Sequence, residues 1–137
     1  MIVSKSTPLI AFARIGELDL LRQIVRHMLL PEAVWREVTD SGDRPGVTEV
    51  CDASWIEVRT VKAIPPEIAS LLDRGEAEVI ALAEEVAADE VLLDERAARA
   101  VATARGLQII GTAGLLGRAR QQDMITVVRP FLGRMQV

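Results

Sequence analysis

The feature that most constrains this chain is the regular alternation of short apolar runs with longer segments of helical periodicity. Apolar runs occupy residues 1–4, 90–95 and 107–112, and each is followed by a segment typical of a helix. These runs do not alternate apolar with polar residues, which is typical of strands that are buried on both faces of a parallel sheet. The sequence therefore predicts an α/β fold: a three-layer α/β/α sandwich with a small, mostly parallel sheet.

Start and stop signals give the approximate boundaries of several elements. Ser6 or Thr7 can cap the first helix, which has a proline in its first turn. Residues 56–61 alternate like an edge strand, and residues 41–46 have the composition of a loop. Residues 65–75 predict a helix that stops at its final glycine.

Length and cysteine usage limit the class of protein. The chain of 137 residues predicts one domain over 1–137, large enough for a single core. The single Cys51 excludes an internal disulfide framework, fits a reducing cytosol and is expected to be a small buried residue. We see neither a signal peptide nor an apolar stretch of the ~18 residues that span a bilayer. The expectation is a cytoplasmic protein with no membrane partner.

Aromatic residues are scarce, because the chain has only two Trp, two Phe and no Tyr. This scarcity argues against a platform for stacking bases. We expect Trp35 and Trp55 to lie in the core or in dimer contacts.

Charge is spread unevenly along the chain, although the net charge is only −4. Residues 1–100 carry a net charge of −8, whereas residues 101–137 carry +4, all of it from arginine. An acidic part beside an arginine-rich part could suit a phosphate-bearing ligand. Arginines on ordinary helix surfaces would produce the same count, so both interpretations stay open.

Three acidic residues border apolar segments. Glu37 lies in an amphipathic segment, Glu76 opens a helix, and Asp94 ends an apolar strand. Carboxylates beside a core are often kept because they meet around a divalent metal. Each acid also has an ordinary explanation: Glu37 as a solvated surface residue, Glu76 as a complement to the helix dipole, and Asp94 as a helix cap.

A helical wheel orients the acids of the segment that starts at residue 76. Glu76 lies within about 50° of the centre of the apolar stripe, and Glu78 points about 110° away. The wheel therefore predicts that Glu76 faces inward and that Glu78 lies at the rim. The apolar stripe consists of Val79, Leu82, Ala83 and Val86.

Four sequence segments together resemble the PIN-domain superfamily, the fold of VapC-type toxin ribonucleases. They are VSKSTPLIAFARIGELDLL at 3–21, PEAVWREV at 31–38, LDRGEAEVIALAEE at 72–85 and VLLDERAARAVATARGLQIIGTAGLLGRAR at 91–120. The chain is most similar to a prokaryotic branch of predicted nucleic-acid-binding proteins. The absence of a glycine-rich phosphate loop after a strand disfavours a flavodoxin-like nucleotide binder.

The resemblance implies an endoribonuclease that uses Mg²⁺ or Mn²⁺. In such a site the metal would position a water and neutralise charge on the scissile phosphate. The implied catalytic and metal-binding residues are Glu37, Glu76 and Asp94, with Glu78, Ser6, Thr7 and Lys5 as accessory residues.

Lys5 departs from the family pattern, because an acid usually follows the first strand. A protonated lysine has three donors and no acceptor, so it cannot ligate a metal. Its ammonium could sit among Glu37, Glu76 and Asp94 in place of the cation, or it could turn to solvent and leave three acids to hold a metal weakly. The first alternative predicts a catalytically dead module that binds RNA or protein. The second predicts an impaired nuclease.

The remaining expectations concern partners. Arg96 and Arg99 lie one turn apart after Asp94 and could contact RNA phosphates, although exposed helix arginines need no such function. The resemblance also implies a homodimer or higher homo-oligomer, with residues 125–132 as a candidate contact. A toxin-like role would add a small antitoxin protein as partner.

Overall fold

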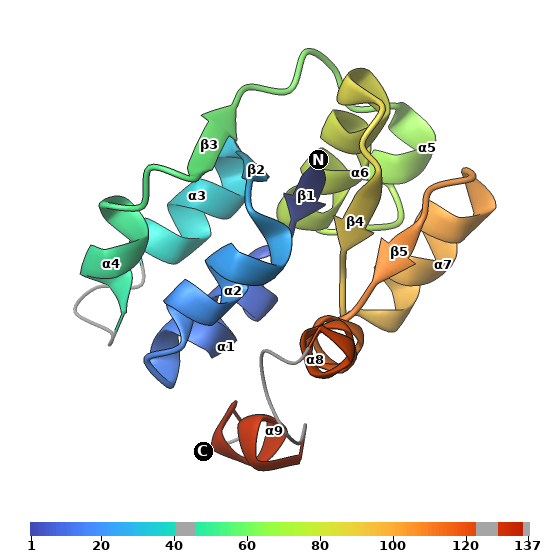
Figure 1. The fold of residues 1–137 in the computed structure, drawn as a ribbon. Helices are drawn as coiled ribbons and strands as arrows, with labels where there is room; N and C mark the ends of the chain where they lie inside the picture. Colours follow the sequence, from blue (N-terminus) through green and yellow to red (C-terminus); the bar gives the residue numbers. More distant parts are fainter. Residues whose placement is uncertain (41–45, 123–128, 136–137) are drawn as a thin grey trace.

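The structure is a computed structural model that describes residues 1–40, 46–122 and 129–135. Its centre is a five-stranded sheet in the order β3-β2-β1-β4-β5, in which every neighbouring pair is parallel (Figure 1). The strands are β1 (Ile2–Ser4), β2 (Met28–Pro31), β3 (Ile56–Arg59), β4 (Glu90–Leu92) and β5 (Ile109–Ile110). The predicted α/β sandwich with a small parallel sheet is therefore confirmed.

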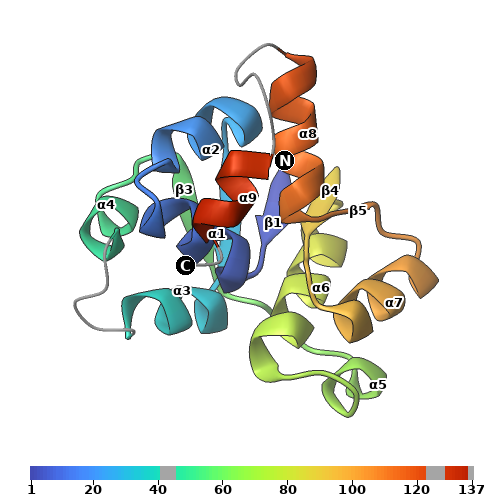
Figure 2. The same ribbon diagram turned by 90° about the horizontal axis from the view of Figure 1, so that it is seen from below.

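Helices flank this sheet on both sides (Figures 1 and 2). Helices α2 and α8 lie on one side and α6 and α7 on the other, while α3 packs against α6. The helices are α1 (Ser6–Arg14), α2 (Leu18–Val25), α3 (Glu32–Thr39), α4 (Val47–Cys51), α5 (Pro66–Ala69), α6 (Arg74–Val86), α7 (Arg96–Ala104), α8 (Thr112–Gln121) and α9 (Arg129–Met135). None of the helices in the described part of the chain has the length and apolarity that crossing a membrane requires.

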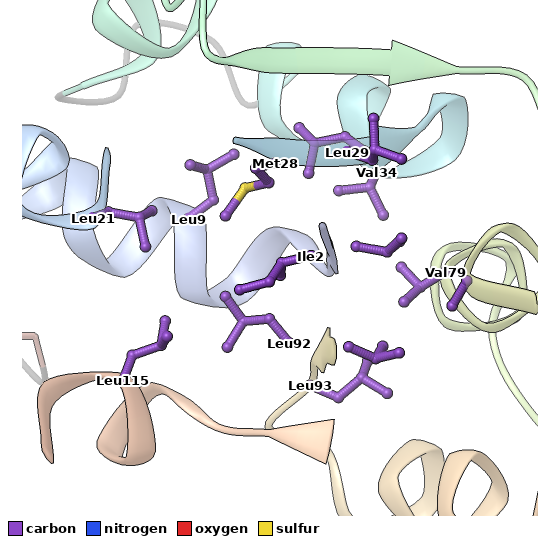
Figure 3. Close-up of a cluster of buried hydrophobic side chains, with 14 of the residues drawn as sticks. Ile2, Leu9, Leu21, Met28, Leu29, Val34, Val79, Leu92, Leu93 and Leu115 are labelled. Carbon is purple, nitrogen blue, oxygen red and sulfur yellow. The ribbon is translucent and has the colours of Figure 1, made fainter. Parts of the chain in front are cut away.

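The core is built from aliphatic side chains that converge on the sheet from both helical layers (Figure 3). Leu9 of α1, Leu92 of β4 and Leu115 of α8 are each fully buried. Full burial of such a side chain stabilises the fold by about 1.5–3 kcal/mol. The core thereby anchors β1 and β4, whose carboxyl ends carry the candidate site.

Two predicted helix boundaries are wrong. Neither Ser6 nor Thr7 caps α1, because the N-cap residue is Lys5 and the helix makes no side-chain cap bond. The helix predicted over 65–75 is only the short α5, and Gly75 lies inside α6 rather than at a helix end. The reason is that α6 is started by Asp73, whose side chain accepts a hydrogen bond from a backbone N–H of the first turn.

The structure also shows where Cys51 and the two tryptophans lie. Cys51 is exposed rather than buried, because the preceding residue, Val50, is the one that α4 turns into the core. Trp35 and Trp55 are partly buried against the core. The loop predicted at 41–46, except for its last residue, and much of the oligomer contact predicted at 125–132 lie outside the described residues.

Candidate functional site

The candidate site lies at the carboxyl ends of the two central strands. Strands β1 and β4 pair in parallel with Ser4 opposite Leu92, so the residues that follow them lie at the same edge of the sheet. The backbone N–H of Lys5 continues this pairing by donating to the Leu92 carbonyl at 3.1 Å. Ligands of parallel α/β sheets gather at this edge, because helix N-termini converge there.

The Lys5 side chain points into the protein. It is only 8 % exposed, and its ammonium donates to both carboxylate oxygens of Glu37, at 3.2 Å to Oε1 and 2.9 Å to Oε2. The Ser6 hydroxyl donates to the same Oε2 at 2.7 Å. Of the two alternatives for Lys5, the structure thus shows the inward orientation. The ammonium pairs with Glu37, whereas Asp94, which that alternative also placed around it, accepts from Thr112 instead.

A capping box brings two further acids beside Lys5. Asp73 Oδ1 accepts from the Glu76 backbone N–H at 2.8 Å, and the Asp73 backbone N–H donates to Glu76 Oε1 at 3.2 Å. The same Asp73 Oδ1 is 4.0 Å from the Lys5 ammonium. The start of α6 therefore presents two carboxyl groups toward the Lys5–Glu37 pair.

Glu76 carries the clearest electrostatic signal of the site. Burial raises its pKa from the ordinary value of 4.5, and the Asp73 and Glu95 carboxylates raise it further. The backbone N–H of Asp73 and the Lys5 ammonium lower the pKa, but they do not outweigh burial. Lys5 therefore compensates the charge of this carboxylate only in part.

Gly75 lies directly against the Lys5–Glu37 pair. A Cβ at this position would come within 2.1 Å of Glu37 Oε1 and 2.9 Å of the Lys5 ammonium. Glycine therefore allows the helix to approach the ion pair closely, because a Cβ would displace the ends of these two side chains; its backbone φ is not in the left-handed region.

Glu78 is buried instead of lying at the rim, which corrects the prediction from the helical wheel. Its side chain is 7 % exposed, and Oε1 accepts from the Ala33 backbone N–H at 3.1 Å. Its Oε2 accepts from Arg74 at 2.6 Å. The wheel missed this role because α3 packs over that face of α6, and Glu78 satisfies a free N–H in the first turn of α3.

Asp94 is bound by the start of α8. Its Oδ1 accepts from the Thr112 backbone N–H at 2.8 Å, and its Oδ2 accepts from the Thr112 hydroxyl at 2.6 Å. Asp94 does not cap α7, whose N-cap residue is Glu95 and which has no side-chain cap bond. The acid therefore fastens β4 to α8 at the edge of the site.

The other predicted residues differ in their surroundings. Arg99 is half-buried, and its guanidinium donates to the Leu93 carbonyl at 3.2 Å. Arg96 is exposed at the first position of α7. Thr7 is exposed and lines a separate hollow with Ile10 and Met135, so it does not join Ser6 at Glu37.

Three residues of the site were not predicted from the sequence. Asp73 could have been found from the capping-box pattern, an Asp three residues before a Glu at the start of a helix. Thr112 follows a glycine at the beginning of a helix, which is a weak signal by itself. Gly75 had no sequence signal, since its importance depends on a side chain from another helix.

The acids as arranged do not fit a divalent metal ion. The Lys5 ammonium faces both oxygens of Glu37, and Thr112 donates to both oxygens of Asp94. Within residues 1–40, 46–122 and 129–135, no group of three or more His, Cys, Asp or Glu side chains could hold a metal ion. No catalytic step through a metal therefore follows from this geometry.

A comparison with protein families gives a match over residues 1–137 to a family described as a PIN domain. The chain therefore belongs to the PIN-domain family, and this confirms the resemblance inferred from the sequence. Among curated proteins the comparison finds no match. Membership associates the protein with nuclease and nucleic-acid-binding functions, and PIN domains generally use divalent metals.

Proposed function

We propose that the protein is a PIN domain that binds single-stranded RNA and does not cleave it by the metal-dependent route of its family. One observation carries the proposal. The Lys5 ammonium stands where the first acid of the family is expected, and it lies within 2.9 Å and 3.2 Å of the two carboxylate oxygens of Glu37. The Lys5 ammonium thus occupies the position at which the family would have a metal-binding carboxylate.

An ammonium offers only hydrogen-bond donors, so it neutralises a carboxylate but cannot coordinate a metal or activate a bound water. Gly75 approaches so closely that even a Cβ would collide with Glu37 Oε1. A hydrated Mg²⁺ needs several oxygen ligands at about 2.0–2.1 Å, and the ammonium holds that side of Glu37.

Binding of RNA is supported by the family and by Arg96, which is exposed at the start of α7. The segment 101–137 has a net charge of +4, but its Arg105, Arg118 and Arg134 are paired with acids of the first hundred residues. Arginine side chains donate to phosphate oxygens in a bidentate manner. We therefore expect binding that weakens as the salt concentration rises.

The test compares the natural chain with Lys5→Asp. Incubation with single-stranded RNA in Mn²⁺ should give no cleavage above that of Glu76→Ala, although gel shift should detect binding. Lys5→Asp should restore metal binding, measured as an Mn²⁺-dependent rise in melting temperature that the natural chain lacks. At a metal concentration 100 times Kd the stabilisation is about 2.7 kcal/mol.

An active endoribonuclease is the competing candidate, favoured by the retention of Glu37, Glu76 and Asp94. RNA cleavage by the natural chain that requires Mn²⁺ or Mg²⁺ and is lost in Glu76→Ala would overturn our proposal in its favour. A toxin role would then follow if co-expression of a small protein encoded beside the gene suppressed cleavage. A homo-oligomer remains a proposal from the family, and light scattering at high protein concentration tests it.

A further inference from the structure

A second surface with binding chemistry lies at the amino ends of the strands, opposite the acid site. A hollow of about 470 Å³ is lined by Arg22, Gln23, Arg26, Ser54 and Trp55, and we call it the Trp55 hollow. Arg26 lies two residues before β2, and Trp55 directly precedes β3. The Met28 N–H donates to the Trp55 carbonyl at 3.0 Å, which holds these two chain segments together.

The lining of the Trp55 hollow is basic. It contains two guanidinium groups, an amide, a hydroxyl and an indole, but no acid. Neighbouring Asp19 accepts from Arg22 at 2.7 Å and from Gln23 at 2.8 Å, so it orients both side chains. Arg26 has no such partner among the described residues, and its side chain lines the hollow.

The backbone of Arg26 is unusual as well. Its φ of 65° lies in the left-handed region, which a residue other than glycine rarely adopts. Glycine would relieve this conformation at the end of α2. The chain therefore carries an arginine at a position where local backbone preference favours glycine.

A second hollow of about 550 Å³ adjoins the first, since Arg22 and Trp55 line both. It is flanked by Ala13 and Leu18 and by the carboxylates of Asp19 and Glu49. Its size lies within the range of about 300–1,000 Å³ usual for ligand sites. Trp55 thus stands between two spaces, one basic and one with apolar walls and hydrogen-bond acceptors.

The two ends of the sheet hold different charged groups. At the carboxyl end the single ammonium of Lys5 faces the carboxylates of Glu37, Asp73 and Glu76, so the cluster keeps an excess of negative charge. At the other end Arg22 is paired with Asp19, so Arg26 is the group of the Trp55 hollow that attracts a phosphate. The Trp55 hollow therefore offers RNA a basic site away from these acids.

From this geometry we infer that the Trp55 hollow and its neighbour bind single-stranded RNA. A phosphate contacts Arg26 and Arg22, and a base stacks on the half-buried indole of Trp55. The acceptors of Asp19 and Glu49 meet the N–H groups of a base. This inference rests on the proposed RNA binding and assigns its location.

The test uses variants that leave the fold intact. Arg26→Gly removes the guanidinium at a position that favours glycine, and should weaken binding of a short fluorescent RNA about tenfold, as loss of ~1.4 kcal/mol predicts. Arg36→Ala is the matched control, because it removes an exposed arginine of α3 that lines neither hollow. It should bind RNA like the natural chain.

Tryptophan fluorescence gives an independent readout, since Trp35 and Trp55 are the two tryptophans of the chain. RNA should quench the emission of Trp35→Phe, in which Trp55 alone remains, and leave that of Trp55→Phe unchanged. If the natural chain binds RNA but Arg26→Gly binds equally well, or Trp55 is not quenched, the location is wrong. If the natural chain binds no single-stranded RNA, the proposed function fails as well.

Discussion

The Lys5–Glu37 pair gives the sharpest prediction, because its two members differ greatly in burial. The Lys5 side chain is 8 % exposed and that of Glu37 is 39 % exposed. Breaking a buried pair by removing one partner costs about 3–5 kcal/mol when the remaining charge stays buried. The cost should therefore depend on which charge is left behind.

Removal of the carboxylate should be the more harmful change. Glu37→Gln leaves the buried ammonium with Asp73 at 4.0 Å as its nearest ion-pair partner in the described part of the chain. We expect a loss of about 2–4 kcal/mol in the free energy of unfolding. Lys5→Met leaves a carboxylate that water can reach, and should cost only about 1–2 kcal/mol.

A double-mutant cycle isolates the interaction between the two charges. In urea unfolding followed by circular dichroism, with EDTA present, the coupling energy of Lys5→Met and Glu37→Gln should be about 1–3 kcal/mol. The control is the exposed Glu32–Arg36 pair, 3.8 Å apart on one helix. Such pairs couple by about 0.3–0.5 kcal/mol.

Two results would refute this reasoning. A cost of Lys5→Met equal to or above that of Glu37→Gln would mean that burial does not set the asymmetry. A coupling energy no larger than that of Glu32 and Arg36 would mean that the inward lysine is not bound to Glu37 in solution.

Three further predictions concern α6. The raised pKa of Glu76 means that the contribution of this group to stability is lost as pH rises from 4.5 through its folded-state pKa. In metal-free buffer, the melting temperature of Glu76→Gln relative to the natural chain should therefore rise over that window. The opposite trend would show that the carboxylate is stabilised. Gly75→Ala should cost about 1 kcal/mol, the lower end of the range for overpacking, because it displaces the flexible end of Glu37. The penalty should shrink in a Glu37→Ala background, and an unchanged penalty would point to the helix itself. Glu78→Ala should lower the free energy of unfolding in urea by about 1–3 kcal/mol, because it leaves the Ala33 N–H without its acceptor. Glu78→Gln keeps an acceptor and should cost less. Equal losses in the two variants would contradict the capping role.

Much of the fold could be predicted because it depends on periodicity. Apolar runs without strict alternation indicated buried parallel strands, and β1, β4 and β5 lie where those runs occur. The expected burial is wrong for β5, which is half-buried because it lies at the edge of the sheet. The order of the strands in the sheet follows from pairing between distant segments. No local sequence pattern predicts that β1 lies between β2 and β4.

The sequence predicted the burial of some site residues correctly and that of others wrongly. The helical wheel placed Glu76 inward correctly, since its burial follows from the apolar stripe of its own helix. It misplaced Glu78 because burial of that residue comes from α3, which packs on a face that the wheel treats as exposed. The importance of Gly75 likewise depends on Glu37 from another helix.

The chemistry that Lys5 brings to the site follows from its residue type. A lysine after the first strand has donors and no acceptor, whatever the fold does with it. That the side chain turns inward depends on the folded chain, because Glu37 accepts hydrogen bonds from the ammonium while the Ser6 hydroxyl donates to the same carboxylate. An ammonium is buried only where a carboxylate lies within hydrogen-bond reach, and such proximity between residues 5 and 37 arises when α3 packs beside the end of β1.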